Sequence, residues 1–312
     1  MKSLTILTPA YKEARNLPRL AAQTDSLIRT RLAPDGYNVR LLIVNDGSPD
    51  DTAEVLADLA GKYPFIDYIN LSRNFGKENA LLAGIDNADG DAVIIMDSDL
   101  QHPVDTIPEM VKYWEEGYDD VYGSRKDRGK ESWLRRKLSL AYYNLLQRST
   151  SQEILPNVGD FRLLDRKCIE VLRQLRETQR YNKGLFAWIG FKKKGVPYST
   201  AERAEGESSF NLRRLLSLSL EGISSTTTAP LRFATWMGII VSFIAFLYLV
   251  FVLTKTIIWG EPVRGYPTLL CVILFLGGCQ LLAIGIIGEY IARIFAETKQ
   301  RPPYIVRDKH IR

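Results

Sequence analysis

Two acidic residues separated by a single residue, Asp97 and Asp99, are the clearest candidates for chemistry in this sequence. They follow the hydrophobic run Val93–Met96, which is typical of a buried strand, and Gln101 comes shortly after them. Two carboxylates at the end of a buried strand repel each other unless a cation neutralises them. Such oxygen ligands suit Mg²⁺ or Mn²⁺, which keep coordination positions open for phosphate oxygens. The pattern therefore predicts a divalent-metal site that receives a phosphate-containing substrate.

Motifs of several other enzyme classes are missing from the sequence. It has no Gly-x-Gly-x-x-Gly after a strand, no Walker A loop and no Gly-x-Ser-x-Gly elbow. The only histidines are His102 and His310, which argues against histidine-based catalysis, and for His102 we expect a structural role. The three cysteines have no disulfide or zinc spacing. No nucleic-acid motif accompanies the net charge of +5, so we expect no nucleic-acid partner.

The elements that must position the acidic pair follow a regular alternation over the first hundred residues. The expected strands, rich in Ile, Val and Leu, are Leu4–Thr8, Val39–Asn45, Ile66–Leu71 and Ala92–Met96. The expected helices are Asn16–Arg31, Asp51–Lys62 and Lys77–Asn87. Ser48 and Pro49 read as the N-cap and first residue of the second of these helices. This alternation predicts an α/β fold with a mostly parallel sheet and helices on both faces.

A polar turn follows each of the four expected strands. The turns are Pro9–Glu13, Asp46–Ser48, Ser72–Lys77 and Asp97–Asp99. Parallel sheets bind ligands beyond the carboxyl ends of their strands. We therefore expect all four turns to meet at one edge and to form a single site.

Two later runs have no Asp, Glu, Lys or Arg. Phe233–Thr254 and Pro267–Gly288 are 22 residues each, long enough to cross a bilayer as helices. Basic residues precede the first run and six more lie within residues 289–312, while the loop between the runs holds only Lys255 and Arg264. This bias, and the lack of a signal peptide, predict a multi-pass protein of the cytoplasmic (inner) membrane with both termini and the catalytic domain in the cytoplasm.

These patterns predict three regions. Residues 1–228 form the cytoplasmic catalytic domain, 229–290 the two-span region and 291–312 a cytoplasmic tail. Two amphipathic stretches in the first region, about 132–148 and 208–225, read as interfacial helices, although the first could equally pack on the sheet. Gly238 and Ser242, four residues apart, and Gln280 inside the second span make a homo-oligomer possible, and pairing of the two spans within one chain explains them equally well.

Four segments of the first half resemble family 2 glycosyltransferases of the GT-A fold. They are Pro9–Glu13, Asn45–Ser48, Leu71–Glu78 and Asp97–Pro103. Later segments are similar to the bacterial two-span polyprenyl-phosphate glycosyltransferases, which include the bactoprenol glucosyltransferases and are related to dolichol-phosphate mannose synthase. These later segments are Gly159–Leu163, Glu202–Ser208, Gly288–Arg293 and Arg301-Pro302. The resemblance covers essentially the whole chain.

The resemblance implies a Rossmann-like GT-A catalytic domain followed by two transmembrane helices. It also implies an inverting enzyme that moves a sugar from a nucleotide-sugar to polyprenyl (undecaprenyl) phosphate, with Mg²⁺ or Mn²⁺, for modification of a cell-envelope glycan such as O-antigen. UDP-glucose is the expected donor; formyl-aminoarabinose, galactose and N-acetylhexosamine remain open. A non-catalytic nucleotide-sugar-binding scaffold is the alternative from another class. A processive polysaccharide synthase would need more spans and a Gln-x-x-Arg-Trp motif, which is missing.

The resemblance also assigns roles to individual residues. Nucleotide binding falls to Pro9, Tyr11, Glu13, Asp46, Lys77 and Asp97, and metal binding to Asp99 and Gln101 with Asp97 beside them. Arg125 and Arg203 would face donor or acceptor phosphates, because guanidinium groups suit them. Asp160 corresponds to the family's candidate base. An acceptor phosphate with a second pKa of about 6 needs little deprotonation, so Asp160 could instead orient a neighbour, and both roles stay open.

The sequence departs from the family pattern at two positions. Asn45 stands where the family often has a second acid, and Ser209 stands where a lysine commonly follows the Gly-x-Ser motif. The second departure leaves the acceptor-phosphate contacts undefined, and Arg213 or Arg214 could supply them.

Overall fold

The computed structural model describes residues 1–125, 158–178, 180–199 and 265–312, with scattered positions between 236 and 258. The chain divides into two compact units, Met1–Leu215 with Arg301–Arg312, and Leu216–Gln300. Both amphipathic stretches, Arg203 and most of the first predicted span lie outside the described residues.

The first unit is built from strands interleaved with helices, as the sequence predicts. Its strands are β1 (Lys2–Ala10), β2 (Tyr37–Asn45), β3 (Ile66–Leu71), β4 (Ala92–Ile95), β5 (Asp120–Arg125), β6 (Val158–Asp165), β7 (Lys193–Tyr198) and β8 (Val306–His310). Its helices are α1 (Leu17–Leu27), α2 (Thr52–Lys62), α3 (Lys77–Asn87), α4 (Ile107–Glu115), α6 (Arg166–Gln174) and α7 (Asn182–Trp188). A π-helical turn η1 (Ile28–Leu32) extends α1, and a 3₁₀ turn η2 (Val104–Thr106) precedes α4.

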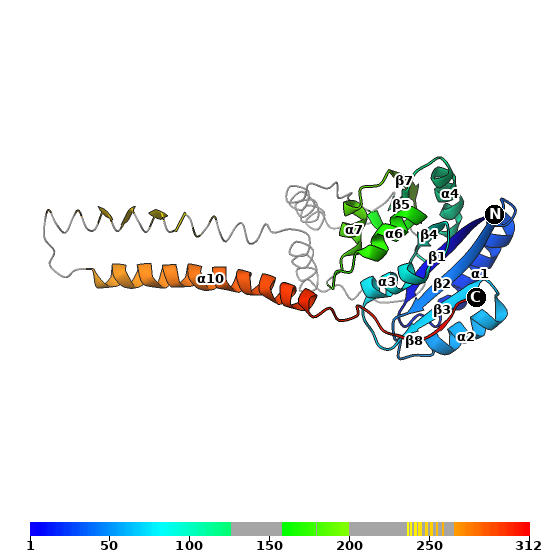
Figure 1. Cartoon of the computed structure of the whole chain (residues 1–312), viewed down its shortest axis with the longest axis horizontal. Coiled ribbons are helices and arrows are strands. Elements are labelled where there is room, and N and C mark those ends of the chain that lie inside the picture. The colour runs from blue at the N-terminus through cyan, green and yellow to red at the C-terminus, as the bar shows by residue number, and fades with distance from the viewer. Residues whose placement is uncertain are drawn as a thin grey trace. The chain divides into compact units, whose positions relative to one another are not determined.

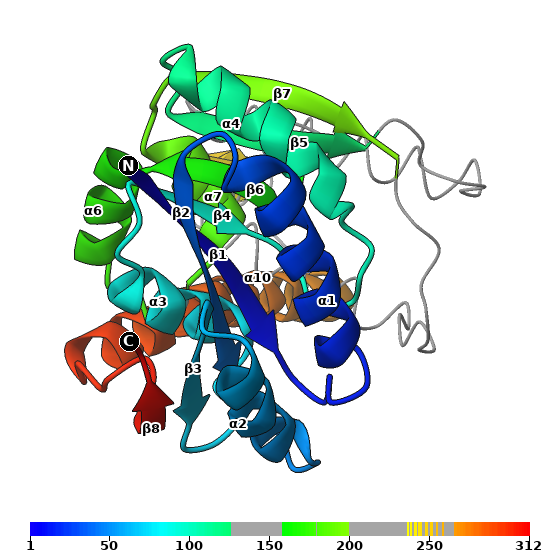
Figure 2. The ribbon, with the colours of Figure 1, turned by 90° about the vertical axis from the view of Figure 1, so that its right-hand side faces the viewer.

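The strands described in this unit form a mixed, mostly parallel sheet in the order β7-β5-β6-β4-β1-β2-β3-β8. Strands β1 to β4 are parallel to one another, whereas β6 runs antiparallel to both β4 and β5. Strand β5 therefore runs in the direction of β1, and β7 is parallel to β5. The carboxyl ends of these parallel strands share one edge of the sheet with the amino end of β6, which is called the catalytic edge below. Figure 1 and Figure 2 show this arrangement.

Helices cover both faces of the sheet (Figure 2). Alternate residues of each central strand point to opposite faces, so Leu41 and Ile43 pack with α1, α2 and α4, while Leu42 and Val44 pack with α3, α6 and α7. All four side chains are buried. Burial on both faces explains why β1, β2 and β4 read as continuous hydrophobic runs.

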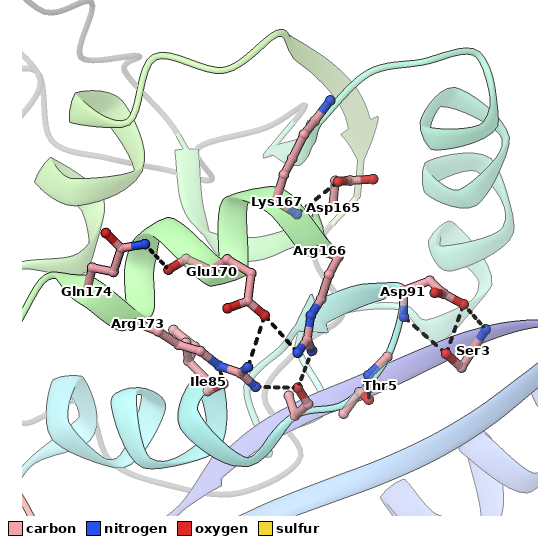
Figure 3. Close-up of polar contacts among 12 residues, drawn as sticks. Ser3, Thr5, Ile85, Asp91, Asp165, Arg166, Lys167, Glu170, Arg173 and Gln174 are labelled. Carbon is pink, nitrogen blue, oxygen red and sulfur yellow. Dashed lines mark hydrogen bonds and ion pairs between the residues drawn. The ribbon is translucent and has the colours of Figure 1, made fainter.

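Helix α6 fastens the carboxyl end of α3 (Figure 3). The Arg166 and Arg173 guanidinium groups donate hydrogen bonds to the Ala88 carbonyl at 2.8 and 2.7 Å, and Arg173 Nε donates to the Ile85 carbonyl at 2.9 Å. Cations at the end of a helix bind its unpaired carbonyls and complement its dipole. Glu170 holds both arginines, with contacts of 2.7 and 3.1 Å. Helix α3, which begins at Lys77, is thereby fixed at its far end.

The last residues of the chain return to the first unit, which carries the catalytic edge and is called the catalytic unit below. The sequence predicts a tail over 291–312, whereas residues 301–312 belong to the same unit as the sheet. Within them, Val306–His310 pairs antiparallel with β3. The two ends of this strand are half-buried and its middle residues are exposed. Charged residues on an exposed edge strand are common, because they discourage pairing with other chains.

The second unit contains helix α10 (Tyr266–Thr298), which includes the second predicted span. Within it, Phe275–Thr298 is long and apolar enough to cross a membrane by length and composition, and it is the one such helix among the described residues. At 33 residues, α10 is about 50 Å long, which exceeds a hydrocarbon core of about 30 Å. Its last turns carry the ion pair between Arg293 and Glu289 at 3.0 Å.

The predicted N-cap of the second helix is wrong. Helix α2 begins at Thr52 with Asp51 in the N-cap position and no side-chain cap. The Ser48 hydroxyl instead accepts a hydrogen bond from the Lys12 backbone N–H at 3.0 Å. Ser48 therefore connects two turns of the catalytic edge and does not start the helix.

Gly47 is required by the way these turns pack. Its φ is +60°, and a Cβ atom there would lie 2.2 Å from the Arg73 backbone carbon. Gly36 has a φ of +86° but open space around it, so it makes a matched control. We expect Gly36→Ala to cost about 1–2 kcal/mol from the left-handed conformation alone. Gly47→Ala, which adds a backbone clash, should lower the melting temperature of the detergent-solubilised chain at least twice as much. Equal shifts in the two variants would contradict this packing.

Candidate active site

The turn after β4 carries the acidic pair, as expected from the sequence. The Ser98 hydroxyl between the two acids donates to the Pro9 carbonyl at 3.1 Å, which joins this turn to the end of β1. Asp99 Oδ1 accepts from the Gln101 backbone N–H at 3.1 Å, and the intervening Leu100 has a φ of +61°. A leucine in the left-handed region is uncommon and costs conformational energy. The turn is therefore held in an unusual shape that leaves both acidic side chains partly exposed.

Lys77 bridges two carboxylates that come from different strands. Its Nζ lies 2.6 Å from Asp97 Oδ1 and 2.7 Å from Asp160 Oδ2. Lys77 is the first residue of α3, Asp97 follows β4 and Asp160 lies near the start of β6. The sequence predicted that these three residues belong to one site, and the structure places them in direct contact. No pattern in the sequence indicates that the lysine forms the bridge.

The charges of this triad determine the protonation of Asp160. Burial raises the pKa of this carboxyl, but the nearby Lys77 and Lys183 and the hydrogen bond from Lys77 lower it further, so the net pKa is below its usual value. Conversely, burial lowers the pKa of Lys77, and the two carboxylates raise it above its usual value by a larger amount. Asp160 and Lys77 are therefore both charged at neutral pH.

One oxygen of Asp160 has no hydrogen-bond partner. The side chain is 9% exposed, and while Oδ2 contacts Lys77, the buried Oδ1 contacts no donor among the described residues. A buried acceptor left unsatisfied costs about 1–3 kcal/mol.

Asp46 organises the turn that leads to Lys77. Its two carboxylate oxygens accept hydrogen bonds from the backbone N–H groups of Phe75 and Gly76, at 2.7 and 2.9 Å. Burial raises the pKa of Asp46 above its usual value, although both hydrogen bonds act in the opposite direction. Gly76 has a φ of +91°, a backbone conformation that favours glycine over residues with a side chain. Asp46, for which a nucleotide contact is predicted, therefore also holds this loop in shape through its own hydrogen bonds.

The remaining predicted nucleotide-binding residues lie in the turn after β1. The Tyr11 side chain is exposed, whereas the Glu13 carboxylate accepts from the Asn16 side chain at 2.6 Å at the start of α1. Pro9 ends the buried part of β1 and offers its carbonyl to Ser98. The Pro9 contact joins the turn after β1 to the acidic turn, as convergence of the turns predicts.

His102 has the structural role expected from the sequence. Its ring stacks on Phe161 with centroids 4.8 Å apart, and its Nδ1 accepts from the Asp97 backbone N–H at 3.1 Å. Burial lowers the pKa of His102, although Asp97 and Asp99 act in the opposite direction. The neutral imidazole therefore stabilises the acidic turn by accepting this hydrogen bond from its backbone.

Two arginines of the site differ in position. Arg125 is exposed at the end of β5, where its Nε donates to the Tyr198 hydroxyl at 3.2 Å. Arg162, which sequence reasoning missed, is buried in an ion pair of 3.0 Å with Asp120 and lies 3.9 Å over the Phe186 ring. Arg125 is thus open to solvent at the edge of the sheet, whereas Arg162 holds β5 and β6 together. A lone arginine within a hydrophobic strand pattern was the available signal.

The acidic turn can accommodate a divalent cation. Its oxygen donors are Asp99, Gln101 and the Asp97 carboxylate that faces Lys77, all partly exposed. The described residues hold no cluster of three acidic, His or Cys ligands. A cation here would take few protein ligands and complete its shell with phosphate oxygens and water, which fits Mg²⁺ and its relatives. The donor set therefore fits the predicted metal.

Comparison with known proteins shows the family of this chain. Residues 5–173 match the family model described as glycosyl transferase family 2, and residues 229–294 match the GtrB C-terminal hairpin. The chain belongs to glycosyl transferase family 2. It is 42% identical to the SfII prophage-derived bactoprenol glucosyl transferase of Shigella flexneri over 98% of both chains. It is 40% identical to the putative glycosyltransferase CsbB of Bacillus subtilis, over 99% of this chain and 92% of that one.

A solved structure shares the fold of this glycosyltransferase at low sequence identity. Mannosyl-3-phosphoglycerate synthase from Rubrobacter xylanophilus is 14% identical, with a TM-score of 0.50 over 70% of this chain and 71% of that one. The likeness concerns the fold alone. It agrees with the GT-A architecture expected from the sequence.

The Lys77 bridge predicts a pH-dependent loss of stability when the lysine is replaced. In the wild type the lowered pKa of Asp160 keeps its stabilisation complete above about pH 4, and it is lost only as the pH falls further. In Lys77→Met, burial and the nearby Asp97 should raise the pKa of Asp160. Stability should then be highest at acidic pH and fall by about 1–3 kcal/mol as the pH rises to neutrality.

The measurement is the melting temperature of Lys77→Met and wild type between pH 5 and 8. Lys2→Met is the matched control, because Lys2 forms an exposed ion pair with Glu115 far from the site. Parallel pH profiles for Lys77→Met and the control would contradict the bridge.

Proposed function

We propose that this chain transfers glucose from UDP-glucose to a polyprenyl phosphate, with undecaprenyl phosphate as the acceptor. The observation that carries the proposal is the 42% identity to a bactoprenol glucosyl transferase across 98% of both chains. The site supports the proposal, because basic and acidic side chains lie together at the catalytic edge of the GT-A sheet. Such an edge suits a sugar diphosphate and its metal ion. The product would serve modification of a cell-envelope glycan.

The reaction is a direct displacement at the anomeric carbon. An oxygen of the lipid phosphate forms a bond to this carbon, the bond from the carbon to the diphosphate breaks, and the nucleoside diphosphate leaves with the electron pair. Configuration inverts because a single displacement occurs. The acceptor is largely dianionic at neutral pH, with a second pKa of about 6, so no proton has to be removed.

The residues of the catalytic edge divide this work. Asp99, with Gln101 and Asp97, would hold Mg²⁺ or Mn²⁺, which when bound supplies positive charge at the diphosphate. Arg125 lies at the same edge and would meet a phosphate group, with Arg203, outside the described residues, as the second predicted phosphate ligand. Asp160 acts as an orienting residue, because its lowered pKa makes it a weak base and Lys77 occupies one of its oxygens.

The membrane segments bring the enzyme to its lipid acceptor. The apolar helix α10 and the match of residues 229–294 to a C-terminal hairpin support two spans. We propose that the catalytic unit and both termini lie on the cytoplasmic side of the inner membrane, where nucleotide-sugars are found. A headgroup that cannot leave the interface is then delivered to a site held nearby, which is a gain in proximity.

The activity is tested by transfer of radiolabelled sugar to undecaprenyl phosphate by the purified full chain. With Mg²⁺ or Mn²⁺, we expect a chloroform-soluble product from UDP-glucose and not from UDP-galactose, UDP-N-acetylglucosamine or a formyl-aminoarabinose donor. Asp99→Ala or a chelator should reduce the rate at least 100-fold, since the diphosphate loses its counter-charge. Asp105→Ala, an exposed acid in η2, is the matched control. Bound UDP-glucose without product from any donor would favour the scaffold alternative.

The role of Asp160 is tested by the pH profile of kcat/KM. If the acceptor dianion is the nucleophile, kcat/KM falls below about pH 6 as the phosphate gains a proton. Asp160→Asn should lower the rate but keep this acidic limb in place. A profile that becomes flat in Asp160→Asn would show that the limb belonged to Asp160 and that it acts as a base.

A further inference from the structure

Besides its backbone pairing with β3, the C-terminal strand β8 contacts the rest of the catalytic unit through a line of polar side chains. Asp308 Oδ1, on β8, accepts from the Asn70 side-chain amide on β3 at 2.6 Å. The Asn70 amide oxygen in turn accepts from the Asn45 side chain on β2 at 2.8 Å. Both asparagines are almost fully buried, at 3% and 2% exposed. The line therefore crosses two strands inside the sheet at its catalytic edge.

The line continues from the strands into the turns of the site. The Asn45 amide oxygen accepts from the Ser48 backbone N–H at 3.0 Å, and the Ser48 hydroxyl accepts from the Lys12 backbone N–H at 3.0 Å. Asn45 thus uses its NH₂ group toward Asn70 and its oxygen toward Ser48. Because each amide group has one orientation that satisfies both neighbours, the orientation of Asn70 sets that of Asn45.

A second contact joins the same C-terminal segment to the loop that carries Lys77. The Ser72 backbone N–H donates to the Ile305 carbonyl at 2.9 Å, immediately after β3 ends. The loop that starts at Ser72 is fastened at its other end by Asp46, which accepts from Phe75 and Gly76. Residues 305–308 therefore contact the start of the Lys77 loop directly, and they reach the Ser48 turn through Asn70 and Asn45.

Strand β8 brings little apolar surface to this contact. Its middle residues are exposed and charged, and its half-buried ends are Val306 and His310. Hydrophobic burial scales with apolar area, so a strand of this composition contributes little core stability. Its polar contribution is the Asp308 carboxylate, which is 49% exposed: Oδ2 pairs with Arg307 at 2.8 Å, while Oδ1 reaches the buried Asn70 amide.

We propose that Asp308 is a positioning residue for donor binding: through Asn70 and Asn45 it orients the turns that hold Ser48 and Lys12. The segment that follows the apolar helix α10 thereby helps to shape the nucleotide site. This inference rests on the proposed function only for the identity of the donor, UDP-glucose.

The test exchanges the two partners of the hydrogen bond between Asn70 and Asp308. Asn70→Asp alone places two carboxylates face to face and should raise KM for UDP-glucose about tenfold with kcat nearly unchanged. Asn70→Asp with Asp308→Asn restores a donor and an acceptor, because the new amide can donate to the new carboxylate while Asn45 still donates to it. The double variant should return KM to within about twofold of wild type. Lys309→Gln, on the same strand but outside the line, is the control.

Hydrogen exchange of the full chain, read by mass spectrometry, gives a second measurement that needs no turnover. Peptides that contain the Lys12 and Ser48 amides should exchange about tenfold faster in Asn70→Asp and return to the wild-type rate in the double variant. Should Asn70→Asp fail to fold, Asp308→Ala on the exposed strand replaces it with the same expectation. Unchanged exchange and KM, or a double variant as impaired as the single, would overturn the inference. If the wild type transfers no sugar while the variants still show the expected changes in hydrogen exchange, the result contradicts the proposed function and leaves this inference standing.

Discussion

The contact on which the site depends is the ammonium group of Lys77 between the carboxylates of Asp97 and Asp160. Without the lysine, the two carboxylates would have no cation between them, and their mutual repulsion would oppose this arrangement. The lysine offsets that repulsion, and it ties the start of α3 to the carboxyl end of β4 and the amino end of β6. The far end of α3 is held by Arg166 and Arg173 from α6. The position of one charge therefore relies on the packing of a whole helix.

The same contact explains why Asp160 is better suited to orient than to remove a proton. A base needs a free oxygen and a pKa near the working pH. One oxygen of Asp160 is occupied by Lys77, and the pKa of the carboxyl is lowered. Its other oxygen has no partner among the described residues but is buried, so it is not open to an incoming proton. An acceptor that arrives as a dianion makes this arrangement sufficient for transfer.

The sequence predicted the strands and turns of the site well because their pattern is local. Buried parallel strands such as Val39–Asn45 are continuous hydrophobic runs, and the structure ends β2 at Asn45 as predicted. Contacts between distant segments carry no such pattern. Asp160 meets Lys77 across 83 positions, and the charged residues of β8 gave no strand signal. Ser48 was misread as a helix cap because its hydroxyl serves a partner in another turn, Lys12.

The most direct test of the central contact is a double-mutant cycle on kcat/KM for sugar transfer, with Lys77→Met, Asp160→Asn and both together. If the lysine acts by neutralising Asp160, removing it costs much less once the carboxylate is an amide. We therefore expect the effects of the two substitutions on kcat/KM to be coupled by at least about tenfold, or 1.4 kcal/mol. Two effects that simply multiply would show that Lys77 and Asp160 act independently, and would contradict the account.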